Sequence, residues 1–350
     1  MASGIESRKK DHLDLCSDDA VSFRRRSTLL DQVRLVHQSL PDLHLDEIDL
    51  SVQMFGKQLK APLLIAAMTG GTEKAAAINR DLAKIAENYG YAFGLGSQRA
   101  MHTQPEQTWT YEVRKWAPST LIFGNVGVVQ ARDMSVSELN TMVRLVGADA
   151  LCAHMNPAME LIQGGGDRDF RGGTDTFKRL ARELSVPVIA KETGCGISKE
   201  TADKLSRAGV LHVDVSGAGG TSWVGVETLR AQGENKKLGE VLWDWGIPTA
   251  VSVHWASSMG LSTIATGGIR HGLDVAAALA MGAHMAGIAR PVLQAYQQGG
   301  IDAVEQFLEQ VQMQLRATML LCGARTIAEL QSAPKVILGE LRDWIGHKTE

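Results

Sequence analysis

The sequence predicts an α/β protein, and within that class a (β/α)8 barrel with an N-terminal extension and C-terminal helices. From residue 61 onward, short apolar runs alternate with helical patterns, which favours a parallel sheet covered by helices. The runs number eight, and a chain of 350 residues is long enough for one barrel of about 250 residues or more. A barrel is therefore favoured over a doubly wound sheet.

The first βα unit shows the pattern most clearly. "APLLIAAMTGG" (61–71) reads as a buried strand that ends in glycines, and residues 72–90 follow it. In that second segment Ile78, Leu82 and Ile85 approximate one apolar helical face, and Gly90 is a stop signal. The other strands are expected at 91–97, 120–127, 149–155, 187–193, 211–217, 262–268 and 283–289, with helical patterns such as 198–209 and 271–282 between them.

Two regions flank this alternation. Residues 1–60 are charged and irregular until about residue 44, and we expect them to form an N-terminal arm that packs on the barrel. Residues 61–350 are expected to form the barrel with its C-terminal helices. The tail from about residue 301 has a helical pattern.

Composition and charge narrow the class of protein. The net charge is −3 and the isoelectric point is near 6.4, so no basic field favours nucleic acid as a partner. The N-terminus lacks the apolar region of a signal peptide, and no apolar run reaches the roughly 18 residues of a membrane span. Cys16, Cys152, Cys195 and Cys322 form no CxxC pair. A cytoplasmic protein without a membrane partner is expected.

The loops after the seventh and eighth strands have the residues of a phosphate site. "ATGGIRHG" (265–272) follows strand seven and "GIARP" (287–291) follows strand eight. In barrels these two loops commonly bind phosphate. Glycine lets the backbone approach the anion, and Arg270 and Arg290 can add charge-assisted hydrogen bonds.

Other strand ends are also polar. Lys191 closes an otherwise apolar fifth strand, and a partly buried lysine is costly unless it pairs internally or meets an anionic ligand. Asp214 and Ser216 share one face of strand six, and His154 and Asn156 share one face of strand four. The convergence of such residues on one rim predicts a functional site.

The stretch "HMNPAMELIQGGGDRDFRGG" (154–173) is read as a glycine-rich loop. Glu160 has no second carboxylate at a helical metal-ligand spacing, so a cation there would be Mg²⁺ held by one carboxylate, water and substrate phosphates. Asp167, Arg168 and Asp169 are expected to pair with one another. The glycines predict a lid that moves.

Several motifs, in order, resemble one known family. They are "RKKDHLDL" (8–15), "MTGGT" (68–72), "GLGSQRAM" (94–101), "FGNVG" (123–127), "HMNPAMELIQ" (154–163), "GDRDFRG" (166–172), "AKETGCGIS" (190–198), "DVSGAGGTSW" (214–223) and "TGGIRHGLD" (266–274). Over most of its length the sequence resembles the type 2, flavin-dependent isopentenyl-diphosphate isomerases. The resemblance implies a barrel that binds FMN.

The resemblance also implies roles for individual residues. The flavin would be surrounded by Ala67, Met68, Thr69, Ser97, Asn125, Lys191, Ser216 and Thr221, and its phosphate held by Gly268, Arg270, Ala289 and Arg290. The substrate diphosphate would meet Arg8, Lys9, His12, Ser97, Arg99 and His154, with Met159 also at the substrate. Glu160 would bind Mg²⁺. Lys191, His154 and Glu160 are the expected catalytic residues.

The implied reaction interconverts isopentenyl and dimethylallyl diphosphate without net redox change. The family requires Mg²⁺ and reduced FMN, with NADPH as reductant, and the flavin would act in acid–base catalysis while the protein supplies orientation and electrostatics. The resemblance further implies a homotetramer or larger assembly.

One position departs from the family pattern. The family has glutamine immediately before the metal-binding glutamate, and here that position is Met159. A thioether is a weak acceptor and donates nothing. Two alternatives therefore stay beside the isomerase: an FMN-dependent oxidoreductase of the hydroxy-acid oxidase type, and a non-catalytic protein that binds flavin or prenyl diphosphate.

Overall fold

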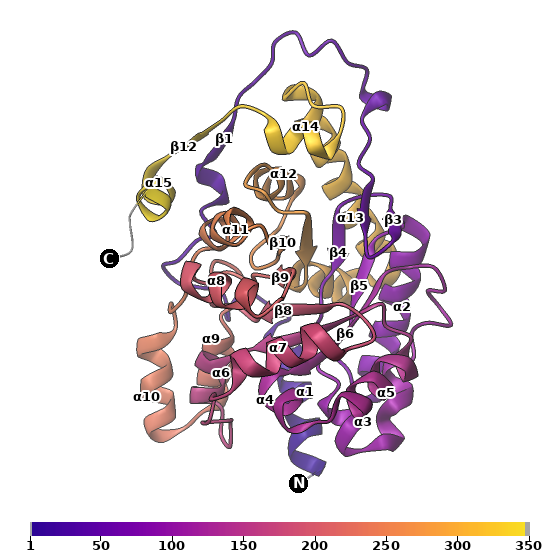
Figure 1. Cartoon of the computed structure of the whole chain (residues 1–350), viewed down its shortest axis with the longest axis vertical. Helices are drawn as coiled ribbons and strands as arrows, with labels where there is room; N and C mark the ends of the chain where they lie inside the picture. The colour runs from indigo at the N-terminus through magenta and orange to yellow at the C-terminus, as the bar shows by residue number, and fades with distance from the viewer. Residues whose placement is uncertain (1, 347–350) are drawn as a thin grey trace.

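The computed structural model describes residues 2–346, which form a closed parallel barrel of eight strands surrounded by helices (Figure 1). The barrel strands are β4 (Leu63–Ile65), β5 (Ala92–Gly94), β6 (Ile122–Gly127), β7 (Ala150–Met155), β8 (Val188–Glu192), β9 (His212–Asp214), β10 (Ser262–Ala265) and β11 (Met285–Ile288). They follow one another around the barrel in chain order, and β11 closes it against β4. All eight predicted strands and the predicted fold class are confirmed.

Helices follow the strands and cover the outside of the barrel. They are α2 (Glu73–Tyr89), α3 (Arg99–Thr103), α4 (Val128–Asp133), α5 (Val136–Val146), α6 (Pro157–Ile162), α7 (Gly173–Glu183), α8 (Lys199–Arg207), α9 (Trp223–Arg230), α10 (Gly233–Leu242), α11 (Thr249–Ser258), α12 (Gly272–Ala280) and α13 (Arg290–Leu321). The predicted stop of α2 is confirmed, because Gly90 caps the helix in the left-handed region at φ 68°. At the other end, the Thr72 side chain accepts a hydrogen bond from the amide of Ala75.

Apolar side chains fill the interior of the barrel toward the end at which the strands begin. Leu64, Phe123, Ile189 and Met285 belong to one buried cluster within the barrel. The hairpin of β2 (Val52–Met54) and β3 (Lys57–Leu59) extends this cluster. Its Phe55 contacts the rings of Phe123 and His212, and its Lys57 pairs with Asp149 at 2.8 Å. The hairpin therefore closes the end of the barrel at which the strands begin.

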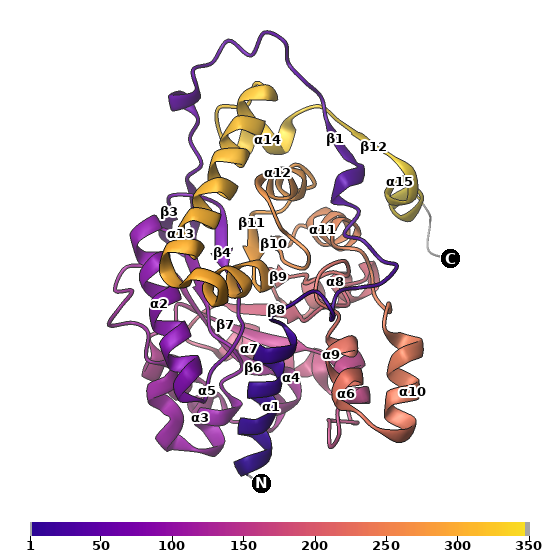
Figure 2. The ribbon, with the colours of Figure 1, turned by 180° about the vertical axis from the view of Figure 1, so that it is seen from behind.

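The N-terminal arm is more regular than its sequence indicates. Residues expected to be irregular form helix α1 (Ala2–Leu15), which lies across the end of the barrel at which the strands finish (Figure 2). Its sequence has no strong apolar stripe, and among the side chains described in this helix only that of Leu13 is buried. Its stability therefore depends on tertiary contacts, which helix propensity does not reveal.

A pair of strands also joins the N-terminal extension to the C-terminal tail. Strand β1 (Val33–Leu35) runs antiparallel to β12 (Lys335–Ile337), which lies in the tail expected to be helical. That tail otherwise holds α13, which is kinked at Gly299 and Gly300, then α14 (Ile327–Ser332) and α15 (Gly339–Gly346). Strand β12 lies outside the alternation of strands and helices that reveals the barrel strands, and its partner β1 lies near the other end of the sequence. Within residues 2–346, no helix has the length and apolar character needed to cross a membrane.

Candidate active site

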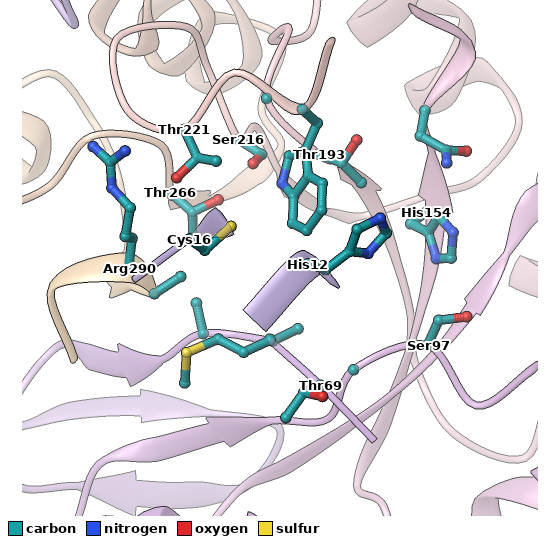
Figure 3. Close-up of a pocket in the computed structure, with 18 of the residues that line it drawn as sticks. His12, Cys16, Thr69, Ser97, His154, Thr193, Ser216, Thr221, Thr266 and Arg290 are labelled. Carbon is teal, nitrogen blue, oxygen red and sulfur yellow. The ribbon is translucent and has the colours of Figure 1, made fainter. Parts of the chain in front are cut away.

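A single cavity at the carboxyl ends of the barrel strands brings together every residue to which the family resemblance assigns a role. Helix α1 contributes Arg8, Lys9 and His12 to its wall. Figure 3 shows Arg290 and His154 on opposite sides of the pocket, with His12 between them. Residues separated by almost the whole chain thus share one site, as expected at this end of a barrel.

Three charged or polar side chains form a row on adjacent barrel strands, and two of them, His154 and Lys191, line the cavity. The strand register places His154 beside Lys191 and Lys191 beside Asp214, on the adjacent strands β7, β8 and β9. The Lys191 Nζ lies 2.7 Å from Asp214 Oδ2, and these residues are only 8% and 2% exposed. Asp214 Oδ1 accepts a further hydrogen bond from Thr266 Oγ1. Lys191 therefore has a buried internal partner and also lines the cavity.

The Arg290 side of the cavity fits a phosphate group. The buried Arg290 Nη2 donates to Ser22 Oγ at 2.8 Å, whereas its Nη1 has no hydrogen-bond partner among the described residues. Burial lowers the pKa of Arg290. An anion would satisfy both the missing hydrogen bond and the desolvated charge.

The backbone beside Arg290 leaves no room for larger residues. Gly268 has φ +74°, and a Cβ on it would lie 2.4 Å from the Thr28 methyl group. A Cβ on Gly220 would lie 2.4 Å from the Gly268 amide nitrogen. The two glycine-rich loops can pack backbone to backbone only because side chains are absent there. Arg290 itself begins helix α13, whose N-terminal amides add to the attraction for an anion.

His154 is neutral in the free protein. Burial, followed by the charges of Lys191 and Arg99, lowers the pKa of His154 to about 4. Its Nδ1 lies 2.8 Å from Asn125 Oδ1, and with that oxygen as acceptor the ring carries its proton on Nδ1. The Nε2 atom then has a free lone pair until an anion raises the basicity of the ring.

Glu160 sits in a short helix rather than an open loop. Within residues 154–173, Pro157 begins helix α6, at the position where its missing N–H costs nothing. The buried Glu160 carboxylate accepts hydrogen bonds from Asn156 Nδ2 at 2.9 Å, Gln163 Nε2 at 3.3 Å and the Asp167 amide at 2.8 Å. Only one of these donors binds Oε1, so a lone pair of Oε1 remains for a cation.

Asp167, Arg168 and Asp169 do not pair with one another as predicted. Arg168 donates to the backbone carbonyl of Glu160 at 2.6 Å, and Asp167 accepts from Gln130 at 2.8 Å. Asp169 pairs instead with Arg171 at 2.8 Å. The loop is thus folded back onto Glu160, through the Arg168 side chain and the Asp167 amide.

Helix α1 is fixed over the cavity by two groups of contacts. Lys9 Nζ donates to the Gly70 carbonyl oxygen and, at 2.8 Å, to the Tyr111 hydroxyl, which donates to the Ser97 carbonyl oxygen at 2.8 Å. Burial, with the charge of Arg8 adding to it, lowers the pKa of Lys9 to about 8. An anion that enters the cavity would therefore stabilise the ammonium form of Lys9.

The second group of contacts centres on Glu227, which is 1% exposed. Its Oε1 lies 2.7 Å from His12 Nε2, and its Oε2 lies 2.7 Å from Arg230 Nη1. Arg230 also pairs with Asp11 of α1 at 3.0 Å. The His12 ring further contacts Trp223 edge to face, with centroids 5.1 Å apart.

Sequence reasoning missed several of these residues. It assigned no role to Tyr111 or Glu227, or to Trp223 and Thr266, which line the cavity. Trp223 and Thr266 lie inside motifs that carry the resemblance, and that position was the available signal. Nothing local in the sequence distinguishes Tyr111 or Glu227.

Comparisons with known proteins decide the family. The family model for FMN-dependent dehydrogenases matches residues 2–110 and 153–336. Isopentenyl-diphosphate delta-isomerases are similar over nearly the whole chain. That of Methanothermobacter thermautotrophicus is 41% identical over 98% of this chain and 97% of its own, and that of Nostoc sp. is 44% identical over 91% of both. The chain belongs to the isopentenyl-diphosphate delta-isomerase branch of the FMN-dependent dehydrogenase family.

Membership of this isomerase branch confirms the family resemblance and is consistent with the predicted FMN cofactor. A solved lactate oxidase from Pediococcus acidilactici superposes with a TM-score of 0.69, covering 97% of this chain and 94% of the oxidase at 16% identity. At that identity the similarity shows the fold alone. The individual roles of the site residues stay predictions.

Proposed function

We propose that this protein interconverts isopentenyl diphosphate and dimethylallyl diphosphate with bound FMN in its reduced form and Mg²⁺. The observation that carries the proposal is one cavity with two anion-binding sides. Arg290 with its unpaired Nη1 supports one, and Arg8, Lys9 and Arg99 support the other. A flavin phosphate and a substrate diphosphate fit these sides, in a chain 41–44% identical to named isomerases.

Residues of the Arg290 side would hold the cofactor. Gly268, Arg270, Ala289 and Arg290 would bind the FMN phosphate at the N-terminus of α13. Ala67, Met68, Thr69, Ser97, Asn125, Lys191, Ser216 and Thr221 would surround the ring. Reduced FMN supplies an electron-rich ring with an acid–base nitrogen and, when anionic, negative charge beside the reacting carbons. Lys191 would balance that charge while Asp214 holds its ammonium group in place.

Residues of α1 and α3 would hold the substrate. Arg8, Lys9 and Arg99 would bind the diphosphate, with His12 and Ser97 nearby and His154 accepting a proton as the anion enters. The free lone pair of Glu160 would bind Mg²⁺. The described residues contain no group of three or more His, Cys, Asp or Glu side chains at metal-binding positions. Water and the diphosphate would therefore complete the magnesium shell.

This arrangement supports a proton shift without net redox change. The reaction adds a proton to one end of the alkene and removes one from the allylic carbon, through carbocation character. Binding of the diphosphate remote from the reacting carbons supplies energy that orients them. Fixed charges such as the Lys191–Asp214 pair need no reorganisation during the reaction.

The test is an anaerobic incubation of the purified protein with FMN, NADPH, Mg²⁺ and isopentenyl diphosphate in D₂O, followed by NMR. We expect deuterated dimethylallyl diphosphate, and none when the reductant or Mg²⁺ is omitted. Absence of product and of exchange while reduced FMN stays bound would refute the proposal. Turnover of a hydroxy acid would instead support the oxidoreductase alternative.

Met159 motivates the second candidate, a protein that binds flavin and prenyl diphosphate without catalysis. Met159 lines the cavity where the family has glutamine, with Asn156 Nδ2 at 3.7 Å from its sulfur. Asn156 and Gln163 already place amide groups around Glu160, which supports retained activity. If wild-type protein is inactive and M159Q restores turnover, this second candidate is correct.

The remaining parts of the proposal concern the setting of the enzyme. We infer a cytoplasmic homo-oligomer, of tetrameric or larger size, that acts on a small molecule and takes electrons from NADPH. Sedimentation equilibrium tests the size. A stopped-flow comparison of NADPH with NADH, which follows flavin bleaching, tests the reductant.

A further inference from the structure

Glu192 lies directly behind the cavity wall. It follows Lys191 on β8, and because side chains alternate along a strand it points away from the barrel interior. Its residue is 6% exposed, and it does not line the cavity. A buried glutamate that faces neither solvent nor ligand requires donors from the protein itself.

Those donors are four consecutive backbone amides. The N–H groups of Thr193, Gly194, Cys195 and Gly196 all donate to Glu192 Oε2, at distances between 2.5 and 3.2 Å. Successive amides that converge on one anion form a nest, and the anion holds the chain in that conformation. Burial raises the pKa of Glu192 to about 7, whereas the hydrogen bonds from Gly194, Cys195 and Thr193 and the charge of Lys191 favour the carboxylate.

The nest is joined to the cavity in two places. Thr193 and Gly194 line the cavity directly. The amide of Gly196, the last member of the nest, also donates to the Ser216 carbonyl oxygen at 3.1 Å. Ser216 lines the cavity with φ +37°, which is uncommon for a residue with a side chain. Such a conformation persists only where the surrounding structure fixes it.

We propose that Glu192 is a positioning residue: its carboxylate shapes the 193–196 loop and thereby holds Thr193 and Ser216 against the cofactor side of the cavity. Only the expected change in kcat rests on the proposed function. The consequence for FMN affinity holds whether or not the protein isomerises the substrate. Glu192 has no contact with Arg8, Lys9 or Arg99 among its hydrogen bonds, so it acts on the cofactor side rather than the diphosphate side.

The experiment compares E192A, E192Q and the wild type, with E87A as the matched control. Glu87 also accepts backbone amides, those of Ser119 and Thr120 at 3.1 and 2.8 Å, but at the opposite end of the barrel. Thermal unfolding of the apoprotein, FMN titration by flavin fluorescence, and kcat and KM for isopentenyl diphosphate are measured for each protein. Wild-type turnover in the same assay tests the proposed function separately.

For E192A we expect an FMN dissociation constant raised about tenfold, as for loss of a hydrogen bond to a charged group. We expect kcat lowered about 100-fold, as for a small misplacement at the reacting centre, with KM for the diphosphate unchanged. E87A should lower Tm and change neither binding nor kinetics.

E192Q retains an acceptor oxygen without the charge. Its FMN dissociation constant should therefore rise about threefold, to a value between those of the wild type and E192A. It carries the test if E192A does not fold. A lowered Tm with wild-type FMN affinity in E192A, or wild-type affinity and kcat in E192Q, would overturn the proposal.

Discussion

Replacing Lys191 by alanine tests two roles of this residue: its ion pair with Asp214 and its proposed contact with the flavin. The change leaves the Asp214 carboxylate, 2% exposed, with Thr266 as its remaining side-chain donor. Removing one partner of a buried ion pair costs about 3–5 kcal/mol, because the other charge stays buried and unpaired. With an unfolding entropy of about 2.1 cal/mol/K per residue, that loss lowers Tm by roughly 4–7 °C in a chain of this length.

The double variant K191A/D214N removes the stranded charge. We expect it to recover most of the stability lost in K191A, because a neutral amide is cheaper to bury than an unpaired carboxylate. FMN affinity and kcat should remain low in both variants, since neither offers a cation to the bound flavin. Lys57 is the control: it pairs with Asp149 at 2.8 Å, but Asp149 also pairs with Arg114 and both partners are partly exposed.

The assays are differential scanning calorimetry of the apoproteins, FMN titration, and isomerase turnover. K57A should cost no more than about 1 kcal/mol, as for an exposed pair. A K191A protein with wild-type Tm would refute the buried-pair argument. A double variant that regains wild-type kcat would show that Lys191 serves only to neutralise Asp214, and its proposed role at the flavin would be withdrawn.

Three further predictions follow from the substrate side. E160Q should weaken Mg²⁺ dependence and turnover while FMN stays bound, which metal titration tests; unchanged kinetics would remove Glu160 from the site. The ammonium form of Lys9, whose pKa is lowered to about 8, is lost as pH rises through that value, so kcat/KM should fall above about pH 8. A K9A profile that keeps this limb would contradict the assignment. E227A should raise KM for isopentenyl diphosphate about tenfold without changing FMN affinity, because Glu227 holds His12. Equal changes in KM and in FMN affinity would count against this role of Glu227.

The fold was predictable because its signals are local and repeated. Most barrel strands lie in short apolar runs with glycine or a polar residue at or shortly after the strand end, as at Gly94 and Glu192. The rule that barrel strands present their carboxyl ends to one site then places Lys191, Arg270 and Arg290 together without any coordinates. Helix α1 and strand β12 were not predicted, because their stability comes from contacts made far away in the sequence.

The same distinction separates the site residues from their partners. The motifs point to Lys9 and His12, but Tyr111 and Glu227, which hold them, lie 102 and 215 residues away. A partner at that separation leaves no periodicity or spacing in the sequence. The loop after Glu160 shows the opposite error, since neighbouring opposite charges suggested local pairs while Arg168 turns to the α6 backbone instead.

Lys191 shows why two interpretations that look exclusive in a sequence can both hold in the fold. A buried lysine was expected either to pair internally or to meet an anionic ligand, because each would repay its desolvation. The barrel register places Asp214 directly beside it, and the same ammonium group lines the cavity. The internal carboxylate lets a cation be kept in place before any ligand arrives. An anionic flavin could then enter without any movement of the lysine, because the same ammonium group would attract the flavin as well as Asp214.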